Sequence, residues 1–149
     1  MKDVRGYFAV LVPDEESDTI GVFFKDHPNI ITYGYDREHA IEMGAEALNA
    51  TLEVEYDRHL PLPNPSGKPR AKKGQEVVFI SLDPEVRTAF LVRGWREEQG
   101  LTQSQMAKRL GVTTQAYQRM ERPGRSNLTV ATLDRIATAL GKRLVLAAE

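Results

Sequence analysis

Four side chains near the end of the sequence have the types and the spacing needed to read DNA bases. They lie within "TTQAYQRMER" and comprise Thr114, Gln115, Gln118 and Arg119. Positions one, three and four residues apart share one face of a helix. Gln pairs in bidentate fashion with adenine, Arg does so with guanine, and Thr contacts bases through its hydroxyl or methyl group. This pattern predicts a helix whose outer face recognises a DNA sequence in the major groove.

Other polar residues nearby are expected to hold the DNA backbone. Gln103 begins the preceding helix, where its side chain and neighbouring amides can meet a phosphate. Thr113 is expected to cap the recognition helix and is counted among the contacts. Arg122 and Arg125 follow that helix and are predicted to contact phosphates. These residues complete the predicted DNA-binding set.

A helix-turn-helix is the element that would present such a face. Thr102 and Gln105 have capping-box spacing at the start of the first helix, and Gly111 suits the turn that ends it. Ala107 is small where the two helices must cross. The residues expected between and beneath the helices are apolar: Met106, Leu110, Val112, Tyr117 and Met120. A purely structural helical bundle with an exposed Gln/Arg face remains the alternative.

The stretch "LTQSQMAKRLGVTTQAYQRMER" resembles the helix-turn-helix of the Cro/repressor-type (Xre) family. It matches the pattern L-T-Q-x-x-[LM]-A-x-x-L-G-V and the closing glutamate. It departs from the family at "ERPGRSN", where Glu-x-Gly is more usual. Flanking helices are expected at 84–100, with Val86, Phe90, Leu91 and Trp95 inward, and at 129–140, with Val130, Leu133, Ile136, Ala137 and Leu140 inward.

The first half of the chain has a different pattern of apolar residues, one that begins with strands rather than helices. Apolar runs at 7–13, 19–26 and 29–35 predict three strands. A helix is expected over 36–59, capped by Asp36, with its apolar face formed by Ile41, Ala45, Leu48, Leu52 and Tyr56. Gly44 is either a small penalty in this helix or a point of close approach to the sheet.

A strand is also predicted at 75–82, after the proline-rich "HLPLPNPSGKPRAKKGQ". The segments that follow it are predicted to be helices, and an isolated strand cannot satisfy the hydrogen bonds of its backbone groups. The strand must therefore return to the first sheet, so the proline-rich stretch is a crossover within one domain. The expected fold class is α+β, with a β-β-β-α-β domain at 1–82 and an all-α domain at 83–149. The segment 142–149 is expected to form a short strand or an arm.

The charge also differs between the first and the second half of the chain. Residues 1–63 carry 5 Lys/Arg and 13 Asp/Glu, whereas residues 64–149 carry 15 Lys/Arg and 8 Asp/Glu. Such asymmetry suggests two different partners, with nucleic acid a candidate for the basic half. The chain has no Cys, and its longest fully apolar run, "YFAVLV", is too short for a membrane span. A cytoplasmic protein without a membrane partner is expected.

The residues give little support for catalysis. Two-metal nuclease chemistry needs carboxylates converging from strands and helices, but the acids Asp14, Glu15, Glu16 and Asp18 fall in one predicted turn. His27, His39 and His59 lack metal-ligand spacing and are interpreted as surface residues. No enzyme activity, metal or cofactor is expected.

The first half resembles the HicB antitoxins of bacterial toxin–antitoxin pairs. The residues that carry the resemblance are Val22, Phe24, Asp26, Pro28, Thr32, Gly34, Ala40, Leu60, Pro61, Pro63 and Ser66, whereas "DHPNIITYG" departs from the usual Asp-Leu-Pro-Gly-Cys. The resemblance implies a partial ribonuclease-H-like domain that masks a small HicA-type ribonuclease toxin. It also implies a repressor that binds operator DNA as a homodimer or tetramer; the contacts with the toxin stay unknown. A stand-alone Xre-type regulator with a ligand-sensing N-terminal domain is the alternative.

Overall fold

The computed structural model describes residues 3–124 and 128–149. The chain divides into two compact units: one is Val4–Asp83, and the other runs from Pro84 onward and includes Asp3. Among the residues described, no helix is both long and apolar enough to cross a membrane. The first unit is α+β and the second is all-α, which confirms the predicted fold class.

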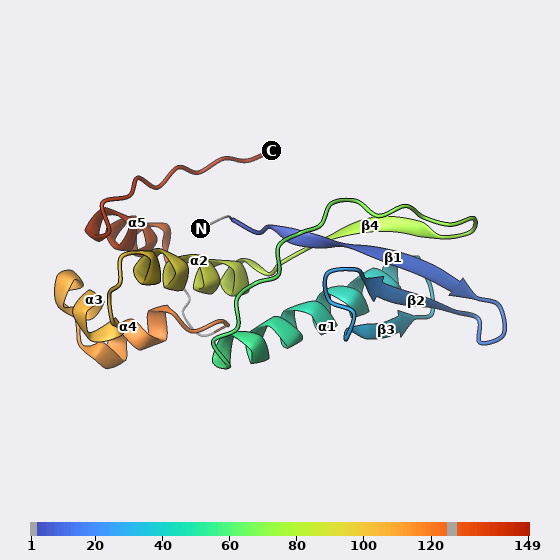
Figure 1. Ribbon diagram of the computed structural model, residues 1–149, viewed down its shortest axis with the longest axis horizontal. Helices are drawn as coiled ribbons and strands as arrows, with labels where there is room; N and C mark the ends of the chain where they lie inside the picture. The colour runs from blue at the N-terminus through green and yellow to red at the C-terminus, as the bar shows by residue number, and fades with distance from the viewer. Residues whose placement is uncertain (1–2, 125–127) are drawn as a thin grey trace. The chain divides into compact units, whose positions relative to one another are not determined.

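The first unit is a four-stranded antiparallel sheet with one helix on it (Figure 1). Its elements are β1 (Gly6–Asp14), β2 (Thr19–Phe24), β3 (Ile31–Gly34), α1 (Arg37–Asp57) and β4 (Glu76–Ser81). The strand order is β3-β2-β1-β4, so the last strand returns beside the first. Gly6 pairs with Ser81 and Leu11 with Glu76. The prediction that the strand after the proline-rich stretch rejoins the first sheet is confirmed.

Alternate residues of the strands point toward α1 and form the core between the sheet and this helix. Tyr7, Ala9 and Leu11 point to the helix and are at most 3% exposed. On α1 the predicted apolar face is confirmed at Leu48, Leu52 and Tyr56. It is wrong in the first turns, where Ala40 and Gly44 are buried while Ile41 and Ala45 are only half-buried. A Cβ placed on Gly44 would lie 2.8 Å from Cδ1 of Ile80, so this glycine marks a close approach of the helix to the sheet.

The proline-rich crossover is tied to the sheet at two points. The hydroxyl of Tyr7 donates to the carbonyl of Pro63 at 2.8 Å, and the Ser66 amide donates to the Asp26 carboxylate at 3.2 Å. Three of these four residues belong to the HicB-like pattern in the sequence. Burial raises the pKa of Tyr7 well above its usual range, because the neutral hydroxyl is favoured away from water.

The prediction that His27 is a surface residue is wrong. Its side chain is 5% exposed and its ring packs edge-on against Tyr7, with the ring centroids 4.8 Å apart. Nδ1 lies 3.9 Å from a carboxylate oxygen of Glu55, and Nε2 is buried without a hydrogen-bond partner. Burial lowers the pKa of His27, and the nearby carboxylates of Glu55 and Asp26 oppose that shift. His27 is therefore a core residue of the sheet unit.

The second unit consists of α2 (Pro84–Glu98), α3 (Gln103–Leu110), α4 (Thr114–Met120) and α5 (Val130–Ala139). The expected core is confirmed at Val86 and Phe90, which are buried, and at Trp95, which packs against the core cluster, but it is wrong at Val130. Val130 is 58% exposed rather than inward. The buried face of α2 also includes Arg93 and Arg96, whereas Leu91 is only half-buried. The segment 142–149 forms neither helix nor strand and exposes Val145 and Leu146.

Candidate nucleic-acid interface

Local side-chain chemistry shapes α3 and α4 into a helix-turn-helix. The Thr102 hydroxyl accepts from the Gln105 amide and the Gln105 side chain accepts from the Thr102 amide, so the predicted capping box is present. Gly111 ends α3 at a φ of 69°, a conformation that favours glycine. The hydroxyl of Thr113 then accepts from the Ala116 amide and caps α4, as expected.

A small apolar core sets the crossing of the two helices. Met106, Ala107 and Tyr117 are at most 2% exposed, and Ile136 of α5 joins them. Leu110, Val112 and Met120 are partly buried against this cluster, as the sequence predicted. Because Ala107 has only a methyl group, α4 can approach α3 closely at this point.

The outer face of α4 presents Gln115, Gln118 and Arg119, all of which are exposed. Thr114 is half-buried, and its hydroxyl lies 3.1 Å from the Ser104 hydroxyl, so this side chain links the two helices. Thr113 likewise uses its hydroxyl within the fold, as the cap of α4. Of the four side chains expected to meet bases, three therefore reach solvent from one helical face.

The buried carboxylate of Glu121 links α2, α3 and α4. It is 1% exposed and accepts hydrogen bonds from Arg96 of α2, Tyr117 of α4 and Gln103 of α3. Nε2 of Gln103 donates to Glu121 at 2.9 Å, so this side chain is held within the protein. The predicted phosphate contact of Gln103 would therefore come from its backbone amide. The sequence contained Glu121 as the closing glutamate of the motif, but no role followed from it.

Positive charge surrounds this motif. The residues from Pro84 onward include 11 Lys/Arg against 6 Asp/Glu. Arg122 follows α4 and is exposed, whereas Arg125 lies outside the residues that the structure describes. An exposed face of Gln and Arg within a basic helical unit fits binding to the phosphate backbone together with reading of base edges. Individual contacts with DNA stay predictions.

Comparison with known proteins gives two family matches that together span most of the chain. Residues 6–85 match the family described as HicB-like antitoxin of bacterial toxin–antitoxin system, and residues 92–146 match a helix-turn-helix family. The chain is 32% identical to "Antitoxin HicB 1" of Photorhabdus laumondii, covering 100% of this chain and 90% of that protein. It is 27% identical to "Antitoxin HicB 2" of the same organism, covering 89% and 91%.

Proposed function

The chain belongs to the HicB-like antitoxins and carries a helix-turn-helix DNA-binding domain, and on this premise we propose that it neutralises a HicA-type mRNA-cleaving toxin and represses its own operon. The observation that carries the proposal is the pairing of an acidic sheet unit with a basic helix-turn-helix in one chain. It acts by binding and is not itself an enzyme. The functional division into residues 1–82 and 83–149 is part of the proposal.

The charge of the sheet unit supports a toxin as its partner. Val4–Asp83 contains 8 Lys/Arg and 14 Asp/Glu. A toxin that cleaves mRNA must bind a polyanion, and proteins do so with Lys and Arg at the surface. Opposite charge speeds association and disfavours wrong partners more than it adds affinity. The acidic unit would therefore find a cationic toxin quickly and cover the surface that binds RNA.

The exposed face of α4 supports operator binding. Helix-turn-helix proteins bind as dimers to two half-sites one helical turn apart, about 34 Å. We propose a homodimer in which Gln115 and Arg119 read bases, with Gln118 beside them. Backbone groups near Gln103 and Thr113, and the Arg122 and Arg125 side chains, would contact phosphates.

Co-expression with the small reading frame beside its gene tests the toxin half of the proposal. The tagged full chain should purify with the untagged product of that frame as a stable complex, and the product alone should stop growth. A harmless neighbour that does not bind would reject the proposal. The operator half is tested by anisotropy with DNA from upstream of the operon, against scrambled DNA at the same salt concentration.

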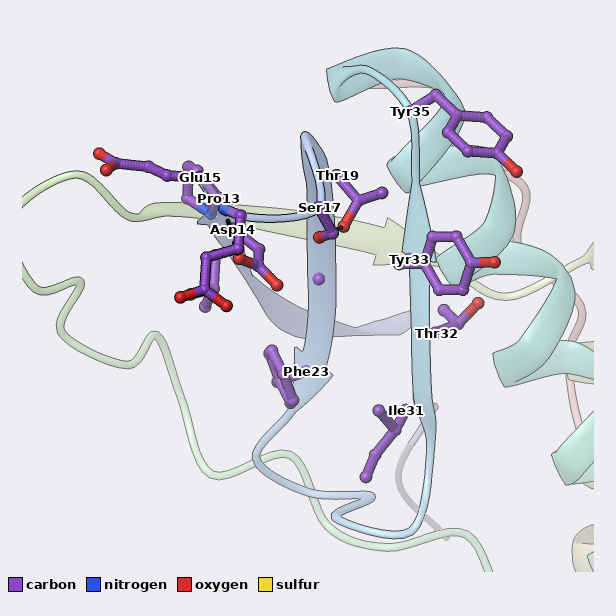
Figure 2. Close-up of a pocket in the computed structure, with 13 residues that line it drawn as sticks. Pro13, Asp14, Glu15, Ser17, Thr19, Phe23, Ile31, Thr32, Tyr33 and Tyr35 are labelled. Carbon is purple, nitrogen blue, oxygen red and sulfur yellow. Dashed lines mark hydrogen bonds between the residues drawn. The ribbon is translucent and has the colours of Figure 1, made fainter.

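A ligand-sensing regulator is the second candidate. It is favoured by a groove of about 820 Å³ on the sheet unit, within the usual size range of small-molecule sites (Figure 2). If the protein is such a regulator, it would bind operator DNA with an affinity that a small metabolite changes. The product of the neighbouring reading frame would then be harmless to growth.

A further inference from the structure

The face of the sheet opposite α1, here called the outer face, is apolar and open to solvent. Strand alternation puts Phe23 of β2, Ile31 and Tyr33 of β3 and Phe79 of β4 on it, and their side chains are 42%, 72%, 54% and 49% exposed. A contiguous apolar patch on a small soluble unit marks a surface that a partner covers.

Glycine makes a hollow in this face. Val12, Gly21 and Tyr33 stand side by side across β1, β2 and β3, and the next row is Val10, Phe23 and Ile31. Since residue 21 has no side chain, the first row is open at its centre; a Cβ there would lie 2.9 Å from the Phe23 ring. The resulting groove of about 820 Å³ runs between the β1–β2 hairpin and β3 (Figure 2).

Aromatic rings and carboxylates line opposite sides of the groove. Figure 2 shows Asp14 and Glu15 of the hairpin on one side and Tyr33 and Tyr35 on the other. The two tyrosine rings meet edge to face, with centroids 6.1 Å apart. Hydrogen bonds from the Ser17 side chain and the Glu16 amide lower the pKa of Asp14, so this carboxyl is ionised at neutral pH. Aromatic faces and carboxylates both favour a cation.

We propose that the outer face is where the basic toxin docks, with an Arg or Lys side chain of the toxin lying over Gly21 between Phe23 and Tyr33. Its charged end would reach the carboxylates of the hairpin, and the apolar row of Phe23 and Ile31 would pack against the toxin's neighbouring side chains. This inference rests on the proposed function, since it takes the toxin as the cationic partner. A long cationic side chain has the apolar stem and charged tip that the groove accommodates.

The solvent face of α1 is the competing surface, because it also carries exposed acids, including Glu42 and Glu46. The test uses the full-length chain and the toxin, recovered from the co-expressed complex under denaturing conditions and refolded. One variant, Ile31→Asn with Tyr33→Asn, is here called the apolar-row variant. It changes Ile31 in the apolar row and Tyr33 in the row beside it to polar, uncharged residues, because an added carboxylate would itself attract a cation. A second, Glu15→Lys with Glu16→Lys, reverses the hairpin charge.

Each variant has a matched control on α1. Val54, which is 50% exposed, gives Val54→Asn as the control for a polar group placed at an exposed apolar residue. Glu42→Lys with Glu46→Lys is the control for a double charge reversal. Circular dichroism melting of every variant verifies the fold, and light scattering gives its oligomeric state.

Titration calorimetry should show at least a 100-fold loss of toxin affinity for the apolar-row variant and about a tenfold, salt-dependent loss for the hairpin variant. Both controls should bind as the wild type does. Unchanged affinity in the two outer-face variants would overturn the inference while leaving the antitoxin function intact. Loss in the α1 variants alone would place the toxin on α1. A changed oligomeric state with unchanged toxin affinity would make the outer face a contact between copies of this chain. If the wild type binds no toxin, the proposed function itself fails.

Discussion

Removing the Glu121 carboxylate should destabilise the helix-turn-helix unit far more than removing any exposed acid. In Glu121→Ala, the guanidinium of Arg96, which is 8% exposed, loses a two-point ion pair, although Nη1 keeps its bond to the Leu101 carbonyl at 2.7 Å. The hydroxyl of Tyr117 loses its acceptor as well. Breaking one side of a buried ion pair costs about 3–5 kcal/mol. A unit of this size loses about 4–8 °C in Tm per kcal/mol, so Tm should fall by roughly 12–40 °C.

Trp95 makes the measurement specific, because it is the one tryptophan in the sequence and it packs against the core of the helical unit. Its fluorescence during thermal unfolding reports that unit alone. Glu97→Ala is the matched control, because Glu97 approaches Arg96 at 3.9 Å but is 56% exposed. An exposed pair of this kind contributes about 0–1 kcal/mol.

Two further variants separate the ion pair from general loss of packing. Glu121→Gln keeps an acceptor oxygen and should fall between the wild type and Glu121→Ala. Arg96→Met combined with Glu121→Leu and Tyr117→Phe removes the buried charge together with the tyrosine hydroxyl, and should recover much of the lost stability. A Glu121→Ala transition no lower than that of Glu97→Ala would refute the stabilising role assigned to the buried carboxylate.

Three other predictions follow from single sites. Arg119→Ala should relax sequence preference at one operator position at a cost of about 1–3 kcal/mol, measured by anisotropy on a panel of single-base variants; an equal loss on all sequences would mean a phosphate contact only. Since burial lowers the pKa of His27 below 6.5, the unfolded state binds the extra proton as pH falls through that value. Urea unfolding should therefore show the sheet unit losing stability between pH 7.5 and 5.5, and His27→Gln should reduce that loss. Gly34→Ala should cost about 3 kcal/mol in the same assay, because its Cβ would lie 2.2 Å from the backbone nitrogen of Ala40. Gly44→Ala, whose methyl meets only the ends of side chains, should cost less.

Local signals in the sequence were sufficient for most of the fold. The caps at Asp36, Thr102 and Thr113 and the turn at Gly111 depend on residues within a few positions of each other, and all four are present. The return of β4 followed from the need to satisfy the backbone of a strand that had no other partner. Such inferences need no knowledge of tertiary contacts.

The errors lie where distant segments meet. His27 sits in a short polar stretch that is typical of a surface loop, but Tyr7 of β1 packs edge-on against its ring and Glu55 of α1 lies 3.9 Å from its Nδ1. Arg96 and Glu121 are 25 positions apart, so no local pattern joins them. Val130 satisfies the helical period of α5, but it occupies the first turn, beyond the reach of the core. In each case a long-range contact, or its absence, decides the burial.

The exposure of Gln115, Gln118 and Arg119 on α4 could be predicted because helical spacing alone separates outward from inward positions. That this face reads DNA stays a prediction. The roles of Thr114 and Gln103 could not be predicted, because their partners, Ser104 and Glu121, are set by how α3 and α4 cross. The outer face of the sheet was also missed as a site, since alternation identified the strands without showing which face α1 would leave open.

An mRNA-cleavage assay tests the antitoxin function most directly. Purified toxin is incubated with a labelled transcript, and the full-length chain is added in increasing amounts. Cleavage should stop once about one chain is present per toxin, and an equal amount of heat-denatured chain should have no effect. Undiminished cleavage at a large excess of folded chain would contradict the account.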